Sequence, residues 1–394
     1  MRVNRMVKYY DIYDLFVSTE KNCLILGWLL LFRTRPFNLH VPARRSYLRK
    51  IPGKFIKIFR VTNLVFRLFL LKNVYRKTNN NFINVPFDGH VVLETSEGYK
   101  VFDLKRRLVA TQYNKEHQGE IFDGIAKKLK EISKYDVSST LKSIDYQRRC
   151  IYEEYLNLYK ANNFYPFSTY FNERILPIWE RNKERFPKRK IDVKTYILNQ
   201  ESFILKSINQ YKEKGHSQEI VDYIRNYTKE LSAGLLAKKS INTINLSLTH
   251  GDMHYKNILL SKKDGLMIDC NTIKERSIFH DFFYMLFYNL FKDSTISYHE
   301  FADKLDACFA KIAIRSQGEN SELGNQFTIH ENDFYRRLFY LEYVSLAFEF
   351  NINIYNDKDQ VQEGLSYYYG HIKLLKDVES NISSRSLGNS EIVS

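Results

Sequence analysis

The sequence is poor in cysteine. Its four cysteines, Cys23, Cys150, Cys270 and Cys308, lie far apart and form no CxxC pair. This spacing argues against a structural zinc site and against a disulfide framework. Free thiols are stable in a reducing compartment, so we expect a cytoplasmic protein.

No apolar run in the chain suggests a membrane span or a signal peptide. The run Cys23–Phe32 has ten residues, about half of the ~20 that a transmembrane helix needs. It also lies behind acidic residues and too far from the first residue to be a typical signal core. Internal repeats are absent as well.

Acidic residues are scarce at the start of the chain. Residues 1–80 contain 17 Lys/Arg and three Asp/Glu, whereas the remainder is balanced with 43 basic and 42 acidic residues. The net charge of +15 therefore belongs almost entirely to the first 80 residues. A basic patch attracts phosphate-rich partners such as anionic lipid, nucleic acid or a polyanionic substrate. A solvated basic face is the plainer alternative.

The same 80 residues interleave basic and apolar side chains at roughly helical spacing, in RRSYLRKIPGKFIKIFR and NLVFRLFLLK. Such a pattern is typical of an amphipathic surface that lies on a membrane or on the rest of the protein. A peripheral membrane contact through residues 1–80 is thus one interpretation. No helix-turn-helix, zinc finger or RNA-binding aromatic motif accompanies the charge, so we expect no nucleic acid partner.

Short β-rich segments follow this basic region. His90–Thr95, Tyr99–Asp103 and Leu108–Tyr113 are separated by short turns, which predicts an antiparallel meander. A helix is predicted within Lys115–Tyr135 from its apolar spacing, and two further strands at Leu141–Asp145 and Cys150–Leu156.

From residue 157 onward the pattern is mainly helical, interrupted by two short strands at Asn257–Leu260 and Gly265–Ile268. We predict helices at residues 170–185, 193–214, 217–238, 281–291, 298–314, 331–350 and 359–380. The predicted class is α+β, with a small antiparallel β-rich N-lobe and a larger helical C-lobe. The predicted domains are a basic and apolar N-terminal extension (1–82), the N-lobe (83–156), the C-lobe (157–380) and a disordered tail (381–394).

The segment LTHGDMHYKNILLSKKDGLMIDCN, Leu248–Asn271, contains the most informative motif. Asp252 follows His250 and Gly251, Asn257 comes five residues later, and Asp269 ends a short apolar strand. Phosphoryl transfer needs a carboxylate that orients or deprotonates the attacking hydroxyl. It also needs hard oxygen ligands for magnesium. One Asp, one Asn and a second Asp supply these groups.

HGDMHYKN followed by IDCN resembles the HGDxHxxN…ID signature of the aminoglycoside-phosphotransferase and choline-kinase-like superfamily. This resemblance implies a bilobal protein-kinase-like fold over roughly residues 84–380, with ATP and Mg²⁺ as cofactors. It implies that Asp252 is the catalytic base, that His250 braces the catalytic loop, and that Asn257 and Asp269 bind magnesium.

Two more residues match the family pattern. His254 corresponds to a histidine that contacts substrate or the loop backbone, and Asp281 to a structural aspartate at the start of a C-lobe helix.

The resemblance also suggests a nucleotide site. IYEEYL resembles the strand that leads into the hinge between lobes, so the backbone of Glu153–Leu156, which includes Tyr155, would meet the adenine edge. Glu120 lies early on the predicted helix and is either the partner of a phosphate-binding lysine or a surface glutamate. The turn Ser96-Glu97-Gly98 has a single glycine and makes a weak phosphate loop.

One departure from the family concerns the lysine of the third strand, where LVATQY has Thr111 or Gln112. Lys100, on the second strand, could reach the phosphates from the neighbouring strand, similar to the relocation in the with-no-lysine protein kinases. Lys115 is a weaker candidate. If neither substitutes, ATP binding would be weak.

The predicted function is an ATP- and Mg²⁺-dependent small-molecule kinase. Its acceptor would be a hydroxyl of a sugar, an amino sugar, an amino alcohol or an envelope or polysaccharide precursor, since bacterial kinases with similar FDL and EEY segments are associated with such pathways. Aminoglycosides are cationic and would require an acidic pocket, for which the C-lobe helices show no acidic cluster.

The alternative function is a non-catalytic kinase-like scaffold, a pseudokinase, at the membrane surface. The missing third-strand lysine favours it, and the intact set of Asp252, Asn257 and Asp269 opposes it.

Overall fold

The computed structural model describes most of the chain and divides it into two compact units. The described residues are 3–12, 15–37, 39, 52–73, 82–95, 98–114, 119–162, 168–213, 217–238, 240–262, 264–292, 301, 305, 329–354 and 358–388. The first unit comprises residues 1–162 and 256–270, and the second comprises residues 163–255 and 271–394.

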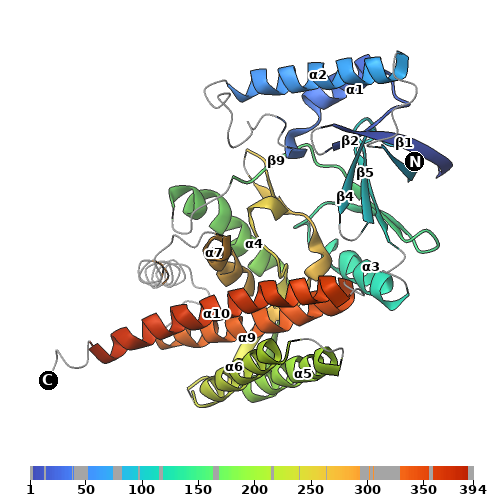
Figure 1. Ribbon diagram of the computed structural model, residues 1–394. Helices are drawn as coiled ribbons and strands as arrows, with labels where there is room; N and C mark the ends of the chain where they lie inside the picture. The colour runs from blue at the N-terminus through green and yellow to red at the C-terminus, as the bar shows by residue number, and fades with distance from the viewer. Residues whose placement is uncertain are drawn as a thin grey trace. The chain divides into compact units, whose positions relative to one another are not determined.

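The first unit is built on an eight-stranded antiparallel sheet of order β3-β1-β2-β4-β5-β6-β8-β7 (Figure 1). Its strands are β1 (Val3–Ile12), β2 (Leu15–Ser18), β3 (Phe82–Phe87), β4 (Val91–Thr95), β5 (Gly98–Asp103), β6 (Leu108–Tyr113), β7 (Leu141–Asp145) and β8 (Cys150–Glu154). A single helix, α3 (Glu120–Ile132), lies between β6 and β7 in the sequence. The predicted meander, helix and strand pair are confirmed, with boundaries that differ by a few residues.

The sheet extends beyond the predicted N-lobe. We expected residues 1–82 to form an extension separate from residues 83–156. Instead β1 pairs with β3, and β2 pairs with β4, so backbone hydrogen bonds join the start of the chain to the meander. The expected linker at residues 77–81 lies outside the described residues.

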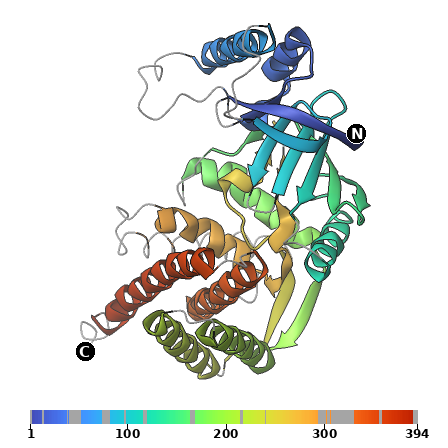
Figure 2. The same ribbon diagram turned by 45° about the vertical axis from the view of Figure 1, so that its right-hand side comes forward.

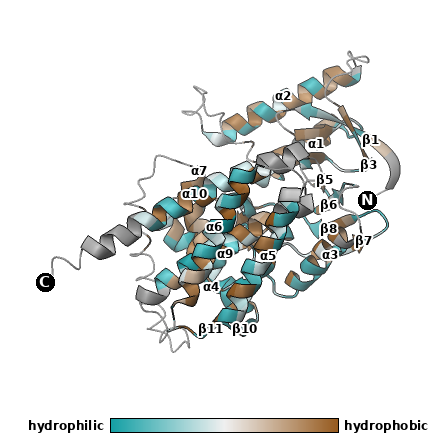
Figure 3. Ribbon diagram, turned by 60° about the horizontal axis from the view of Figure 1, so that its bottom comes forward, coloured by the Kyte–Doolittle hydropathy of each residue, from teal (hydrophilic) through white to brown (hydrophobic). Residues whose placement is uncertain are grey.

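Two helices of the basic region cover part of this sheet. Helix α1 (Cys23–Phe32) begins where the Asn22 side chain accepts hydrogen bonds from the backbone N–H groups of Leu24 and Ile25. After the short 3₁₀ helix η1 (Arg35–Phe37) comes α2 (Gly53–Asn73), which runs beside α1 (Figure 2). Brown hydrophobic residues recur along α2 between teal hydrophilic ones (Figure 3).

A second, three-stranded sheet of the first unit has the order β13-β12-β9. Its strands are β9 (Tyr159–Lys160), β12 (Ile258–Leu260) and β13 (Gly265–Met267). β12 and β13 form the hairpin predicted from the sequence, whereas β9 is too short to be recognised by periodicity. The flanking 3₁₀ helices are η4 (Tyr255–Asn257) and η5 (Cys270–Thr272).

The second unit is mainly helical, as predicted. It contains the π-helix η3 (Phe171–Ile175), α4 (Leu176–Arg185), α5 (Val193–Glu213), α6 (Gln218–Leu236), α7 (His280–Lys292), α9 (Ile329–Ile354) and α10 (Lys358–Gly388). The helix predicted at residues 298–314 lies outside the described residues except for Phe301 and Leu305. Residues 381–388, which we expected to be disordered, continue α10.

The second unit also contains a small antiparallel sheet that the sequence did not reveal. Its order is β10 (Lys188–Asp192), β11 (Thr243–Thr249) and β14 (Lys274–Ser277). β10 is an exposed, largely basic edge strand, so it lacks the apolar alternation by which a strand is recognised. β11 and β14 flank the motif of Leu248–Asn271, and their pairing brings its two ends together.

The buried carboxylate of Glu342 on α9 connects three parts of the second unit. It accepts hydrogen bonds from the Tyr196 hydroxyl (2.6 Å), from the backbone N–H and the hydroxyl of Ser277, and it lies 3.0 Å from His280 Nδ1. Burial alone would raise the pKa of Glu342. The hydrogen bonds from His280, Tyr196 and Ser277 nevertheless lower this pKa below its ordinary value.

We expect Glu342→Gln to lower the free energy of unfolding by about 2–4 kcal/mol at neutral pH, because it leaves buried donors without a charged acceptor. The loss should be complete above the ordinary glutamate pKa and should vanish as the pH falls through the lower pKa of the folded state. Urea unfolding measures both effects. The control is Glu275→Gln, which removes an exposed carboxylate paired with Arg189 at 2.7 Å and should cost less than about 1 kcal/mol. Equal losses in the two variants would contradict the role of Glu342.

Candidate active site

The turn that carries Asp252 is fixed by a buried carboxylate. β11 ends at Thr249, and the next residues, His250 and Gly251, donate their backbone N–H groups to the two oxygens of Asp281 at 2.7 and 2.8 Å. Asp281 lies in the first turn of α7, as the family resemblance implied. The two hydrogen bonds fix the direction of the chain where it leaves the strand.

Gly251 is required by the shape of this turn. Its φ of 82° lies in the left-handed region, which favours glycine. A Cβ atom at this position would lie 2.8 Å from Arg276 Nη1 and 2.9 Å from the Thr272 carbonyl oxygen. Arg276 itself donates to Thr249 Oγ1 and to the Thr272 carbonyl. The segments before and after the motif are therefore packed on one guanidinium.

His250 braces the turn from inside. The ring is fully buried, and its Nδ1 accepts a hydrogen bond from the backbone N–H of Asp252 at 3.2 Å. An accepting Nδ1 places the ring proton on Nε2. The Thr272 hydroxyl donates to the His250 carbonyl at 2.6 Å. These contacts agree with the bracing role that the resemblance implied.

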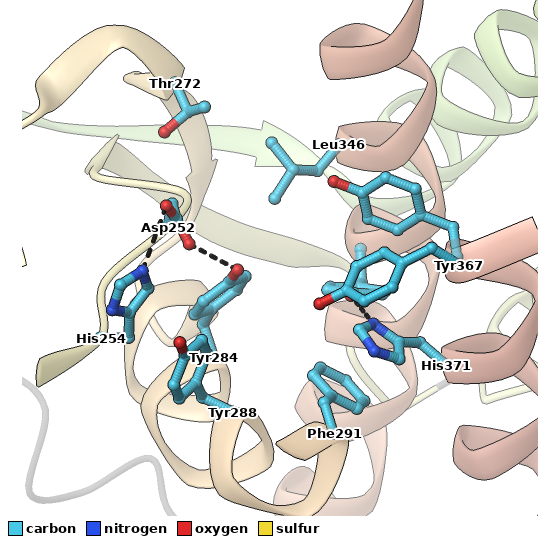
Figure 4. A pocket seen from close by; sticks show the side chains of 11 residues that line it. Asp252, His254, Thr272, Tyr284, Tyr288, Phe291, Leu346, Tyr367 and His371 are labelled. Atoms are coloured by element: carbon cyan, nitrogen blue, oxygen red, sulfur yellow. Dashed lines mark hydrogen bonds and ion pairs between the residues drawn. The ribbon is translucent and has the colours of Figure 1, made fainter. Parts of the chain in front are cut away.

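Asp252 presents its carboxylate to two aromatic side chains (Figure 4). The hydroxyl of Tyr284 donates to Oδ1 at 2.6 Å, and His254 Nε2 lies 3.5 Å from Oδ2. Burial would raise the pKa of Asp252, but the hydrogen bonds and charge of His254, with the hydrogen bond from Tyr284, lower it below its ordinary value. The carboxylate is therefore ionised at neutral pH and can accept a proton or a hydrogen bond.

A small cavity of about 190 Å³ opens beside Asp252, and aromatic rings dominate its walls. The aromatic lining residues are Tyr284, Tyr288, Phe291, Tyr343, Tyr367 and Tyr368. Among the described residues that line it, Asp252 is the only acidic one, and His254, Thr272 and His371 are the other polar ones apart from the tyrosines. The ring of His254 stacks on Tyr288 with centroids 4.3 Å apart. The sequence did not reveal this cavity, because its walls come from the turn after β11, from η5 and from helices α7, α9 and α10.

The first unit contains the two residues predicted to bind magnesium. The pairing of Ile258 with Met267 in the β12–β13 hairpin places Asn257 opposite Ile268, whose N–H donates to the Asn257 carbonyl at 3.0 Å. Asn257 and Asp269 therefore lie at the same end of the hairpin. Asp269 has a φ of 65°, a strained conformation that an aspartate tolerates better than most residues.

Lys100 reaches Asp269 from the second strand of the meander. Its Nζ lies 2.8 Å from Asp269 Oδ1. In the β5–β6 register Lys100 is directly opposite Thr111, one of the two positions, with Gln112, that the resemblance gives for the family lysine, and opposed residues of an antiparallel pair share a face. The amine therefore comes from the neighbouring strand but serves the same face of the sheet.

The side chain of Glu153 also lies close to the charges of Lys100 and Asp269. This side chain accepts a hydrogen bond from the Ser139 hydroxyl at 2.6 Å. Burial raises the pKa of Glu153 above its ordinary value, and the negative charge of Asp269 raises it further. The hydrogen bond from Ser139 and the positive charge of Lys100 lower this pKa but do not cancel the effect of burial. We predicted a backbone role for Glu153; the structure adds a carboxyl group close to Lys100.

A second lysine near Asp269 was missed. Lys160 on β9 has a lowered pKa because it is buried and lies close to the charges of Lys100 and Lys256, while Asp269 opposes the shift. Nothing in the local sequence YKAN marks this lysine, because β9 is brought to Asp269 by its pairing with β12.

The remaining nucleotide candidates are placed differently. Tyr155 is buried, its hydroxyl donates to the Arg33 carbonyl at 2.6 Å, and its N–H donates to the Arg107 carbonyl at 2.9 Å. It can therefore offer only its carbonyl to an adenine edge. Glu120 is the first residue of α3, and its side chain lies outside the described part of the structure, as do Lys115 and the Ser96-Glu97 turn.

Asn257 and Asp269 are chemically suited to hold Mg²⁺. Both offer hard oxygen donors, and magnesium is commonly bound by one or two such side chains together with substrate phosphates and water. Among the described residues, no cluster of three or more His, Cys, Asp or Glu forms a metal cage. A two-residue site completed by phosphate oxygens is the arrangement that these residues fit.

No protein-family model matches the chain. No curated protein matches it either.

Solved structures do match, at low identity. A choline kinase from Cryptosporidium parvum Iowa II is 10% identical, over 80% of this chain and 95% of that chain, with a TM-score of 0.48. An ethanolamine kinase from Plasmodium vivax is 13% identical over 88% and 98% of the two chains, with a TM-score of 0.45. A choline kinase from Streptococcus pneumoniae is 14% identical over 69% and 90%, with a TM-score of 0.41. These are kinases of the group that the HGDMHYKN motif resembles, and at such identities the likeness concerns the fold alone.

We expect Tyr284→Phe to shift the acid limb of a pH–rate profile to higher pH, because the carboxylate of Asp252 loses a hydrogen bond that lowers its pKa. The maximal rate should fall about tenfold, the equivalent of roughly one hydrogen bond to a charged group. Tyr288→Phe is the matched control, since it removes a hydroxyl from the same cavity and keeps the ring that stacks on His254. An acid limb that stays in place in Tyr284→Phe would rule out this role of the tyrosine.

We expect Lys100→Met to weaken the binding of magnesium–ATP by about tenfold or more, because a cation near the phosphates is lost. Titration calorimetry measures the affinity. Lys142→Met is the control, because Lys142 lies on the same sheet and pairs with Glu154 at 3.1 Å. An unchanged affinity in Lys100→Met would show that this lysine does not replace the one missing from β6.

Proposed function

We propose that this chain is an ATP- and Mg²⁺-dependent phosphotransferase that acts on the hydroxyl of a small molecule. The observation that carries the proposal is the ionised carboxylate of Asp252, held by a braced turn at the mouth of a small aromatic cavity. An activated hydroxyl acceptor needs such a carboxylate, and little else in phosphoryl transfer requires protein chemistry.

The second support for the proposal is the set of polar residues found with Asp269 in the first unit. Asn257 and Asp269 would hold Mg²⁺, which neutralises phosphate charge when it is bound. Lys100 and Lys160 would supply cations for the phosphates of ATP. Asp252 and Asn257 are only five positions apart in the sequence, so the chain itself limits the distance between the base and the first metal ligand.

In the proposed reaction the acceptor oxygen attacks the γ-phosphorus of ATP. A new P–O bond forms, the bond between the γ-phosphorus and the bridging oxygen breaks, and ADP leaves. The hydroxyl proton passes to Asp252. The hydrogen bond from Tyr284 holds the carboxylate in one orientation, which is its contribution to the geometry of attack.

The cavity favours an amino alcohol or an amino sugar over the other acceptor classes. Its volume of about 190 Å³ is below the roughly 300–1,000 Å³ of sites for drug-sized ligands. It therefore suits an acceptor with few heavy atoms, or one end of a larger envelope precursor. Faces of Tyr and Phe attract an ammonium group by cation–π interaction. The described lining residues include a single carboxylate and so lack the acidic character that an aminoglycoside would require.

The proposed reaction also bears on the location of the protein. Transfer from ATP fits a cytoplasmic location, and the described cysteines Cys23, Cys150 and Cys270 are free.

The pseudokinase alternative keeps one supporting observation, the lack of a lysine in the β6 segment LVATQY. The ion pair of Lys100 with Asp269 supports the catalytic function over that alternative.

We expect magnesium–ATP to stabilise the purified protein, by about 2.7 kcal/mol at one hundred times its Kd. Thermal-shift measurements should show that Asp269→Asn loses this stabilisation. Asp252→Asn should keep the stabilisation and lose turnover, because its metal ligands are intact. ADP release and ³¹P NMR with choline, ethanolamine and glucosamine as acceptors measure turnover.

The two variants separate the competing functions. Stabilisation without a phosphorylated product for any acceptor that binds in the cavity would favour a nucleotide-binding scaffold. The absence of any shift at millimolar ATP would reject the proposed nucleotide site.

A further inference from the structure

Helices α1 and α2 each bury one face on the sheet of the first unit. Leu26, Leu29 and Leu30 of α1 share a core cluster with Val61, Leu64 and Leu68 of α2 and with residues of β2, β4 and β5. The helices also touch each other closely, since a Cβ atom on Gly27 would lie 2.8 Å from Val65. They therefore form a layer of two helices whose inner side is already packed (Figure 2).

The outer side of this layer is apolar as well. The exposed residues are Leu24, Ile25, Trp28 and Phe32 of α1, between 54% and 79% exposed, and Phe55, Ile58, Phe59, Phe66 and Phe69 of α2, between 49% and 64% exposed. On each helix these residues recur at intervals of one, three, four or seven positions, so they line one helical face opposite the buried one. We refer to these nine residues as the outer apolar face.

This concentration is far from the ordinary scatter of exposed apolar side chains. Nine of the 14 large hydrophobic residues that are exposed in the described part of the chain belong to the outer apolar face. A concentration of exposed apolar side chains on two helices in contact marks an interaction site on a folded protein. Five of the nine residues are phenylalanine and one is tryptophan, side chains that are common on the apolar face of helices lying in a membrane interface.

The charge around the face selects the kind of partner. Residues 21–80 contain 14 Lys/Arg and no Asp or Glu. In the sequence of α2 the cations Lys54, Arg60 and Arg67 are interspersed with the apolar residues, and Lys54 lies over the ring of Phe55 with its Nζ 5.3 Å from the centroid. A partner that meets this surface must combine negative charge with an apolar interior.

We propose that the outer apolar face of α1 and α2 docks on a membrane that contains anionic lipid. The aromatic and aliphatic side chains enter the boundary between headgroups and acyl chains, and the Lys/Arg side chains contact lipid phosphates. No helix among the described residues is long and apolar enough to cross a membrane, so the pair would lie in the plane of the interface.

A second copy of the chain is a poorer partner for the same face. Two copies joined there would bring two strongly basic surfaces together, and like charges oppose such a contact. Nucleic acid would match the charge and could stack on the aromatic rings, but the exposed side chains of Leu24, Ile25 and Ile58 would gain no contact of this kind. An anionic lipid surface satisfies both the charge and the apolar character.

The test uses the full-length protein and two kinds of vesicle, pure phosphatidylcholine and an equal mixture of phosphatidylcholine with phosphatidylglycerol. We expect co-sedimentation with the anionic vesicles only, weakened by added salt. The chain has two tryptophans, and Trp179 is buried whereas Trp28 is 54% exposed. A blue shift of the emission on anionic vesicles would therefore report the insertion of Trp28.

The double variant Phe59→Ser/Phe66→Ser should weaken vesicle binding by about tenfold or more, because two rings no longer leave water. Leu198→Ser is the control: Leu198 is 42% exposed on α5, outside the outer apolar face, and its loss should leave vesicle binding unchanged. Phosphotransfer without vesicles should be equal in all three proteins, so a failure of the proposed enzyme activity would not be mistaken for a failure of docking.

Three results would overturn the docking proposal. One is the absence of binding to anionic vesicles, and another is equal binding to both kinds of vesicle. The third is a dimer in light scattering that dissociates in Phe59→Ser/Phe66→Ser, since this would assign the outer apolar face to a second copy.

Discussion

The carboxylate of Asp281 holds the turn on which the rest of the site depends. By accepting the backbone N–H groups of His250 and Gly251, it fixes the chain at the end of β11 in a conformation that only glycine tolerates easily. The direction of the Asp252 side chain follows from this turn. Its hydrogen bond from Tyr284 follows as well, because Tyr284 and Asp281 lie on the same helix, α7. The role proposed for Asp252 needs such support, because small errors in the position of a base reduce the rate strongly.

Around Asp269 the protein collects positive charge from separate strands. Lys100 comes from β5 of the eight-stranded sheet, and Lys160 comes from β9, which its pairing with β12 brings close to Asp269. β6 carries no lysine, and Lys100 on the neighbouring strand β5 lies directly opposite its Thr111. Opposed residues of an antiparallel sheet share a face and lie within about 5.5 Å of each other, so a lysine on β5 can serve the face that Thr111 occupies.

Much of the fold could be predicted from local patterns. Turn residues between β-branched segments predicted β4, β5 and β6, and apolar spacing predicted α3 and the long helices of the second unit. The sequence did not show that β1 and β2 belong to the same sheet as β4, because that pairing depends on contacts between residues distant along the chain. The short strand β9 and the basic edge strand β10 carry too little periodicity to be recognised.

The sequence by itself determined the chemistry: Asp252, Asn257 and Asp269 have fixed identities and spacing, and the lack of acidic residues at positions 21–80 is a property of composition. Only the tertiary structure decided which groups these residues meet. The contact of Tyr284 with Asp252, the reach of Lys100 to Asp269 and the choice of which face of α1 and α2 is buried each join segments that are distant in sequence. Hydrogen bonds and packing act over a few ångströms of space, so no local pattern can specify them.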